Sequence, residues 1–294
     1  RTEEVDQLEK DIAQHQGILD SKAKVQGINI KELQAVAKQY GQPRRTRLIY
    51  SDELEKYQEE EEIPDYPVHL FFTRDGYFKK ITPQSLRMSG EQKLKEGDMI
   101  VQQLESTNNV DLLFFTDKAQ VYKAKASDFG DNKARVLGEY ITAKLGMDEA
   151  ENALYMAVTK AYSGYMLFFF ENGKVAKVSM DSYATKTNRR KLLGAYSDKS
   201  PAASIAYIQE DCEFLLASAQ GRMLLMHTGS VQPKTTRNTQ GVAAMTLRKG
   251  GRLLRAVPYV EGMLKKPDRY RKNIPALGAL PTPEESEGEQ MTFG

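Results

Sequence analysis

Basic side chains recur along this sequence in a repeated context, and they have the clearest chemical potential. The first pair, Lys79 and Lys80, lies in HLFFTRDGYFKKI (69–81). Lysine and arginine neutralise phosphate groups, and arginine also forms forked hydrogen bonds with two phosphate oxygens. Cations repeated at one edge of a fold would therefore suit a polyanion. The candidate phosphate-binding residues are Lys79, Lys80, Arg87, Lys93, Lys95, Lys123, Lys125, Lys133, Arg135, Lys174, Lys177, Arg189, Arg190, Lys191, Arg222, Lys234 and Arg237.

The element that must position these cations is a β-hairpin that recurs along the chain. In each copy an apolar run is followed by a turn pair and an alternating strand. Asp75-Gly76 and Asn172-Gly173 suit type I′ turns, which need positive φ, whereas Lys118-Ala119 predicts a longer turn or another type. The related segments are HLFFTRDGYFKKI (69–81), DLLFFTDKAQVYKAKASDF (111–129), YMLFFFENGKVAKVSMDSY (165–183) and EFLLASAQGRMLLMHTGSV (213–231).

The spacing of the hairpins predicts a propeller-like fold. A recurrence of about 40–50 residues built on strands is typical of propeller blades. Further apolar runs at 98–105, 153–161, 203–209 and 252–260 supply more strands, so about four blades of four strands are expected. A radial arrangement would also protect the edges that one long open sheet would expose.

A second set of basic clusters lies in the loops that follow the hairpins. Loops at equivalent blade positions should lie on one rim, and a basic rim would suit duplex DNA, which is bound by neutralising many phosphates. The alternative is that each lysine only keeps a strand edge soluble and unpaired. The clusters are Lys133 with Arg135, Arg189 to Lys191, and Lys234 with Arg237, and a looser one holds Arg87, Lys93 and Lys95.

The loop TTRNTQGVAAM (235–245) is rich in hydrogen-bonding side chains. Arg237 and the backbone N–H groups of this loop could lie along a sugar-phosphate chain. The competing interpretation is a polar turn with Gly241 at a position of positive φ.

Catalysis and metal binding are not expected from this sequence. It contains no GxGxxG after a strand, no P-loop, no HExxH and no GxSxG. Cys212 begins a predicted buried strand, and nothing near it would lower the pKa of its thiol. The three histidines are scattered without metal-ligand spacing. A single cysteine excludes an internal disulfide and favours a reducing cytoplasm.

The net charge of +2 hides a basic middle between acidic ends. Residues 67–280 hold 32 Lys+Arg and 21 Asp+Glu, whereas residues 1–66 hold 10 and 15 and residues 281–294 hold none and 4. Charge of this kind indicates partners rather than fold. No apolar run approaches the ~20 residues that a membrane span needs, and no signal peptide is visible. The chain begins at Arg1, so we expect a piece of a longer polypeptide.

The segments that flank the hairpins predict four regions. Val5, Leu8 and Ile12 begin a helical seam that breaks near Gly27 and ends at a C-cap glycine, Gly41. Such a seam suits two amphipathic helices or part of a coiled coil whose partner helix lies elsewhere. The predicted regions are 1–48, a coiled-coil arm segment; 49–66, an acidic linker; 67–264, the propeller-like domain; and 265–294, a loosely held tail that is Pro-rich and then acidic.

Three segments together make the chain resemble the C-terminal part of the A subunit of bacterial type IIA DNA topoisomerases, the gyrase and topoisomerase IV family. They are HLFFTRDGYFKKITP, KLKEGDMIVQQLESTNNVDLLFFTDKAQVYKAKASDF and TRNTQGVAAM. IKELQAVAKQYGQPRRTRLI (30–49) also resembles the family's returning coiled-coil helix.

The resemblance implies a mainly β fold, a β-pinwheel whose blades exchange a strand, preceded by a short α-helical coiled-coil segment. It implies a domain that binds and bends duplex DNA within an ATP-dependent enzyme of the bacterial cytoplasm, associated with the nucleoid. Implied partners are double-stranded DNA, a B subunit and a second A subunit, with no membrane. The catalytic tyrosine would lie upstream of Arg1, so these residues alone would be inactive. No cofactor is implied here, and ATP and Mg belong to the full enzyme.

One departure from the family concerns supercoiling. Gyrases that introduce negative supercoils carry a Gln-Arg-Arg-Gly-Gly-Lys-Gly motif, or box, after the first hairpin. At that position this sequence has LRMSGEQKLKEGD (86–98), which keeps little of the motif. A role like that of topoisomerase IV, or of an atypical gyrase, is therefore expected. The alternative from another class is a propeller that docks a second protein.

Overall fold

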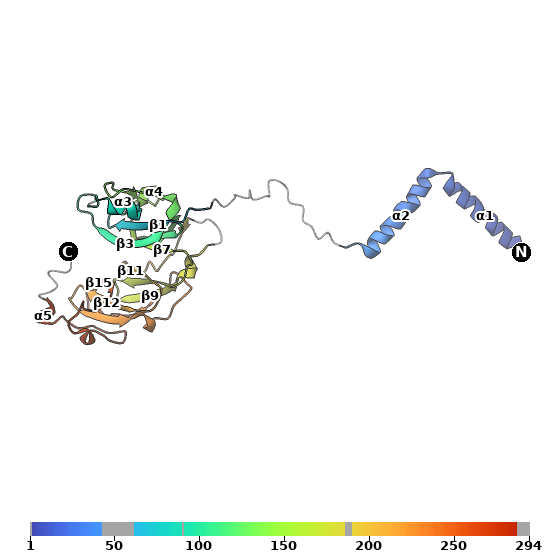
Figure 1. Ribbon diagram of the computed structural model, residues 1–294. Helices are drawn as coiled ribbons and strands as arrows, with labels where there is room; N and C mark the ends of the chain where they lie inside the picture. Colours follow the sequence, from blue (N-terminus) through green and yellow to red (C-terminus); the bar gives the residue numbers. More distant parts are fainter. Residues whose placement is uncertain (1, 43–61, 90, 186–189, 287–294) are drawn as a thin grey trace. The chain divides into compact units, whose positions relative to one another are not determined.

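The computed structural model describes residues 2–42, 62–89, 91–185 and 190–286. Contacts divide the chain into two units, Arg1–Glu61 and Glu62–Gly294. The first contains helices α1 (Thr2–Leu19) and α2 (Lys22–Tyr40) (Figure 1). The predicted break near Gly27 is wrong, because the helices separate at Asp20–Ser21 and Gly27 lies within α2. Gly41 is the C-cap residue as predicted, and its N–H donates to Ala37 O at 2.8 Å.

The apolar seam of these helices is exposed within its own unit. Leu8 and Ile12 of α1 are 61% and 65% exposed, and Leu33 of α2 is 68% exposed. A coiled coil with another helix would cover such side chains, and it stays a prediction.

The second unit is built from short strands with brief helices between them (Figure 1). The strands are β1 (Pro67–Thr73), β2 (Tyr77–Ile81), β3 (Ile100–Thr107), β4 (Asp111–Thr116), β5 (Val121–Lys125), β6 (Glu139–Tyr140), β7 (Ala153–Thr159), β8 (Tyr165–Phe170), β9 (Lys174–Ser179), β10 (Lys191–Leu192), β11 (Ala202–Ile208), β12 (Glu213–Ser218), β13 (Met223–His227), β14 (Val242–Ala243) and β15 (Leu253–Pro258). The helices are α3 (Pro83–Arg87), α4 (Ile141–Lys144) and α5 (Pro283–Ser286), and the 3-10 turns are η1 (Ala126–Asp128), η2 (Met180–Tyr183), η3 (Thr228–Ser230) and η4 (Pro267–Arg269).

These strands form four antiparallel sheets, which we call blades one to four. Their orders are β3-β1-β2-β6, β10-β5-β4-β7, β11-β8-β9-β14 and β13-β12-β15. The short strand at one edge of each complete blade comes from the chain segment after the next hairpin: β6 follows β5 yet pairs with β2, and β14 follows β13 yet pairs with β9. In blade four, Ala279 takes this place by bridging Met223. Four propeller-like blades and the strand exchange of a β-pinwheel are thus confirmed.

Adjacent phenylalanines explain how successive blades pack. Neighbouring residues of a strand face opposite sides of a sheet, so the pair Phe114-Phe115 in β4 serves two neighbours. The Phe114 ring lies 5.7 Å from the ring of Phe72 in blade one, and the Phe115 ring lies 5.6 Å from that of Phe168 in blade three. All these rings are buried. The apolar run of each hairpin is therefore continuous because both faces of the blade are covered.

The outward faces of the first and last blades are covered by the chain itself. In blade one, Phe71 and Ile81 pack with Leu86 of α3. In blade four, Leu225 packs with Leu264 and Tyr270. The array therefore ends on capped faces rather than on exposed apolar sheets.

The segment after residue 264 is part of the fold, which corrects the expected loosely held tail as far as residue 286. Tyr270 is fully buried, and its hydroxyl donates to the buried Glu285 carboxylate. Burial would raise the pKa of Glu285, but hydrogen bonds from Tyr270 and Thr282 outweigh it and lower that pKa to about 2. The pinwheel thus continues beyond the predicted boundary at residue 264, whereas residues 287–294 of the predicted tail lie outside the described residues.

The hairpin turns differ from the type I′ turns predicted. Type I′ needs positive φ at both central residues, but only the second residue of each pair has it: Gly76 (87°), Ala119 (53°), Gly173 (80°) and Gly221 (73°). In every case its N–H donates to the carbonyl three residues earlier. This is a three-residue loop with a left-handed last residue. Lys118-Ala119 therefore forms the same turn as the others.

Gly241 tolerates no side chain, for a reason beyond its φ of +74°. A Cβ there would lie 2.1 Å from Val175 O, because the backbone approaches β9 closely just before β14. Gly241→Ala is expected to lower the free energy of unfolding by about 3 kcal/mol, measured by urea denaturation. Gly250→Ala, at φ +75° with no heavy atom within 4 Å, should cost only about 1 kcal/mol. Equal losses would contradict the close approach.

Candidate nucleic-acid interface

Three of the predicted DNA-binding lysines occupy the same position in successive hairpins. Lys80, Lys123 and Lys177 each lie four residues after the left-handed turn residue. Their ammonium groups donate to a carbonyl in the 3-10 turn that follows the next hairpin: Ala126 O at 3.1 Å, Tyr183 O at 2.9 Å and Thr228 O at 3.4 Å, respectively. We call these three the inter-blade lysines, since each joins its blade to the next.

Acidic and aromatic groups complete the sites of the inter-blade lysines. Lys177 pairs with Asp211 at 2.5 Å and lies 4.4 Å from the Tyr165 ring centroid. Burial would raise the pKa of Asp211, but hydrogen bonds from Lys177 and Thr228 lower it overall. Lys123 lies 4.9 Å from the ring centroid of Tyr162, and burial lowers the pKa of its ammonium.

Lys79 also points into the protein. Its ammonium donates to Gln92 Oε1 at 2.7 Å, Lys93 O at 2.9 Å and Ala134 O at 3.3 Å, and the residue is 0% exposed. Burial lowers the pKa of this ammonium. A phosphate cannot reach either lysine of the first hairpin in this conformation. The expectation that they are rim cations is corrected, and so is the alternative that they only keep a strand edge soluble.

Two of the predicted arginines are held by main-chain carbonyls. Arg222 donates to Gly278 O at 3.0 Å, and Arg237 donates to Ser182 O at 3.0 Å. Arg237 therefore fixes the position of its own loop, and Gly241 in that loop has positive φ. Both observations favour the polar-turn interpretation of TTRNTQGVAAM over a backbone cradle for DNA.

The basic loop clusters occupy equivalent places in successive blades. Asn132 N donates to Lys80 O at 2.6 Å, Lys123 N donates to Arg190 O at 2.7 Å, and Lys234 N donates to Lys177 O at 2.9 Å. Each loop thus runs beside the free edge of a return strand, on the side away from the first hairpin strand. We call this surface the outer edge and define it as segments 131–135, 190–193, 232–237 and 270–273.

Four of the predicted cations on the outer edge are accessible to a ligand. Lys133, Arg135, Arg190 and Lys234 are exposed, and no hydrogen bond or ion pair joins their side chains to another described residue. Lys191 pairs with Asp148 at 2.8 Å, and this hydrogen bond raises the pKa of its ammonium.

The remaining predicted cations lie elsewhere on the blades. Lys93 and Lys125 are exposed, and Lys174 is half-buried. Lys95 pairs with Asp75 at 3.4 Å, and Arg87 donates to a carbonyl of its own helix, Pro83 O. Arg189 lies outside the described residues.

Sequence reasoning missed the outer edge of blade four. Leu225 N donates to Tyr270 O at 2.9 Å and Lys272 N donates to Leu225 O at 3.3 Å, so Arg271 and Lys272 take the place of the loop cations in the earlier blades. Lys272 is exposed, whereas Arg271 pairs with Glu213 at 2.5 Å. The basic residues at 269–272 could have indicated this surface, but they fall in the segment 265–294 that the sequence predicted to be a loosely held tail.

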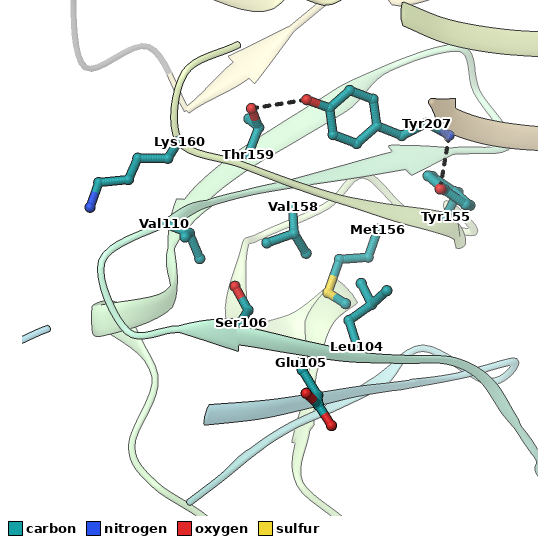
Figure 2. Close-up of a pocket in the computed structure, with 10 residues that line it drawn as sticks. All are labelled: Leu104, Glu105, Ser106, Val110, Tyr155, Met156, Val158, Thr159, Lys160 and Tyr207. Atoms are coloured by element: carbon teal, nitrogen blue, oxygen red, sulfur yellow. Dashed lines mark hydrogen bonds between the residues drawn. The ribbon is translucent and has the colours of Figure 1, made fainter. Parts of the chain in front are cut away.

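A pocket of about 290 Å³ opens between β3 and β7 (Figure 2). Its apolar wall includes Leu104 and Val158. The Tyr207 hydroxyl lies 2.6 Å from Ser163 O, and the Lys160 ammonium pairs with Asp65 at 3.3 Å. These polar groups are therefore committed to the protein.

The described residues offer no metal site, no membrane-spanning helix and no activated thiol. Across 2–42, 62–89, 91–185 and 190–286, no group of three or more His, Cys, Asp or Glu side chains could hold a metal ion. None of the helices in these ranges combines the length and the apolar character of a membrane span. Burial raises the pKa of the Cys212 thiol, with a further contribution from Asp211, which disfavours the reactive thiolate.

Comparison with known proteins gives a consistent result. The sequence model of the family described as "DNA gyrase C-terminal domain, beta-propeller" matches residues 111–135 and 213–258. The A subunit of DNA gyrase from Streptomyces coelicolor is 27% identical over 85% of this chain, and the A subunit of DNA topoisomerase 4 from Bacillus subtilis is 26% identical over 65% of it. These matches cover 31% and 24% of the two relatives, so the chain spans about a third or less of their length.

The fold has a counterpart among solved structures. The crystal structure of the C-terminal domain of DNA topoisomerase IV superimposes with a TM-score of 0.64 at 20% identity, covering 74% of this chain and 73% of that one. The blades and their order thus match a known arrangement.

Proposed function

We propose, given that this chain belongs to the family of C-terminal domains of DNA gyrase and topoisomerase IV A subunits, that its β-pinwheel binds double-stranded DNA along the outer edge. The observation that carries the proposal is the repeated placement of Lys133, Arg190 and Lys234 beside equivalent return strands. Unpaired cations at regular intervals neutralise successive phosphates of one duplex.

The proposed contact set differs from the one expected from sequence. It keeps Lys133, Arg135, Arg190 and Lys234, adds Lys272, and includes Lys191 where a phosphate can compete with Asp148. The inter-blade lysines and Lys79 are left out because their ammonium groups donate hydrogen bonds to carbonyl groups of the protein. The exposed cations Arg87, Lys93, Lys95 and Lys125 and the half-buried Lys174 are secondary candidates, and so is Arg189.

In the whole protein this domain would bend a duplex and present it for strand passage. The relatives are topoisomerase A subunits, so we infer that cleavage by a tyrosine, ATP hydrolysis with Mg, the B subunit and the second A subunit lie outside the pinwheel. Such an enzyme would act on the nucleoid in the bacterial cytoplasm.

Duplex binding is expected to be strongly salt-dependent. Neutralising five or so phosphates gives a slope of about −4 to −5 in a plot of log K against log salt concentration. Fluorescence anisotropy with a labelled duplex of about 30 base pairs, titrated at several salt concentrations, measures that slope. Undetectable binding, or a slope near zero, would refute the proposal.

Residues 86–98 lack the gyrase box, which favours bending of the duplex without wrapping it around the domain in a defined hand. In place of a basic box, Leu86 of α3 packs on Phe71 and Ile81 of blade one, and the following loop accepts hydrogen bonds from Lys79 at Gln92 Oε1 and Lys93 O. Relaxing a plasmid with a separate topoisomerase in the presence of this protein should leave its linking number within about one turn of the protein-free value. A progressive shift of one sign with protein concentration would indicate gyrase-type wrapping instead.

A further inference from the structure

A second concave site lies at the turn end of blade one. It has a volume of about 440 Å³, and its lining includes Arg74, Tyr77, Lys95, Tyr140 and Asn152. The lining residues come from the first hairpin, the loop before β3, the exchanged strand β6 with α4, and the start of β7. The cations of the outer edge do not line this site.

Two tyrosines form one wall of the site. Tyr77 and Tyr140 are paired across β2 and β6, and their ring centroids lie 5.2 Å apart with an interplanar angle of 37°. Tyr140 is 41% exposed, and its ring lies over the turn at Gly76. Neither ring belongs to a buried cluster of the core, so packing within the fold does not account for them.

The aromatic pair is specific to blade one. The residues after the turn in the other hairpins are Gln120, Lys174 and Arg222, and Ala243 stands opposite Lys174 in blade three. In the described residues, only blade one carries two rings outside the buried core at this position, with Tyr140 exposed and Tyr77 half-buried. Because the other blades fold without such a pair, the two rings are not needed for the blade itself, and they indicate a ligand that binds blade one.

Charge at the mouth of the site favours an anion beside the rings. Arg74 and Lys95 have side chains 56% and 54% exposed, and they share one carboxylate, Asp75, at 3.6 and 3.4 Å. Arg74 also donates to Gly97 O, which holds its guanidinium at the mouth. The lining therefore combines aromatic faces with two cations that share one counter-charge, and it includes Asn152, whose amide donates to Asp117 Oδ2 at 2.9 Å.

We propose that this site binds an unpaired nucleobase of single-stranded DNA, with the base stacked on Tyr77 and Tyr140 and its phosphate beside Arg74 and Lys95. Aromatic side chains stack on any base, and a nearby cation holds the backbone, which is how proteins bind single strands without reading sequence. A paired base within a duplex cannot reach the rings without leaving its stack. The domain thus has a single-strand site separate from the duplex surface proposed above.

The test compares a single strand with a duplex on the same protein. A labelled oligo-dT of about 10 nucleotides serves as probe, because it forms no secondary structure, and anisotropy is measured with it and with a duplex. Replacing both tyrosines (Tyr77→Ala with Tyr140→Ala) should weaken oligo-dT binding about 10-fold and change duplex binding less than 2-fold. Replacing both with phenylalanine should retain binding, since the rings remain. Leu254→Ala, an exposed apolar change on β15 of blade four, is the matched control and should have no effect.

Three results would overturn the inference: no oligo-dT binding by the unaltered protein, an unchanged affinity in the alanine pair, or equal losses for oligo-dT and duplex. If the alanine pair does not fold, photocrosslinking of the unaltered protein to 5-iodouracil-containing oligo-dT replaces it. Crosslinks at Tyr77 or Tyr140 support the site, and crosslinks only elsewhere refute it. A failure of duplex binding along the outer edge leaves these readouts intact, so the two proposals fail separately.

Discussion

Lys177→Ala is expected to lower the free energy of unfolding of the pinwheel by about 3 kcal/mol. The side chain is 3% exposed, and its removal takes the ion-pair partner from Asp211, one donor from Thr228 O and the cation from the Tyr165 ring. Removing one member of a buried ion pair typically costs about 3–5 kcal/mol. The lower end applies because the Asp211 side chain is 35% exposed and can be hydrated. Urea denaturation followed by circular dichroism measures the change.

Lys174→Ala is the matched control for this prediction, since it removes the same charge from the same strand. Lys174 is half-buried and has no side-chain partner among the described residues, so its loss should cost about 0.5 kcal/mol or less. Lys177→Met, which keeps the aliphatic stem, should fall between the two. If Lys177→Ala were no more destabilising than Lys174→Ala, the inter-blade role would be wrong.

The position of the inter-blade lysines also explains where the array ends. The residue equivalent to Lys177 in blade four is Leu225, which is buried against Leu264 and Tyr270 instead of reaching toward a fifth blade. A lysine there would place its charge under an apolar cap, which is costly without a partner. The change from lysine to leucine therefore coincides with the change from a neighbouring blade to the C-terminal cap.

The hairpins and blades were predictable because blade packing requires particular residue types at regular positions in the sequence. Pairs such as Phe114-Phe115 are needed to cover both faces of a blade, and the left-handed turn position selects glycine in three of four copies. The exchanged strands were not predictable from residue pattern, because two residues, as in β10, show no periodicity. The resemblance to a family supplied the exchange instead.

The candidate site was predictable only in part, because a recurring lysine has two physical causes. A cation that neutralises phosphate and a cation that donates to buried carbonyls produce the same spacing, and only burial separates Lys80 from Lys133. The tail was misjudged for a similar reason. Proline and charge dominate 265–286, yet Leu264 and Tyr270 pack on blade four and Ala279 bridges Met223.

Neutralising the outer edge is expected to have the largest effect on DNA binding. The variant that combines Lys133→Ala, Arg135→Ala, Arg190→Ala and Lys234→Ala removes four exposed cations without known partners in the described residues. Each lost phosphate contact reduces the magnitude of the salt slope by about 0.9, so the slope should fall by about 3–4 and affinity at ~0.1 M salt by about a thousandfold. Stability should change little, because these side chains are exposed.

The control for this variant carries the same change in net charge elsewhere on the pinwheel. Lys118, Lys160, Lys199 and Lys249 are exposed and none lies on the outer edge, so their combined replacement by alanine should weaken duplex binding less than about 10-fold. Local contacts and overall charge are thereby separated, since only local contacts change the number of ions released. Equal losses in the two variants would mean that the general field of the domain, rather than the outer edge, attracts the duplex. A loss confined to the outer-edge variant would mean that the DNA phosphates lie along the outer edge from blade one to blade three.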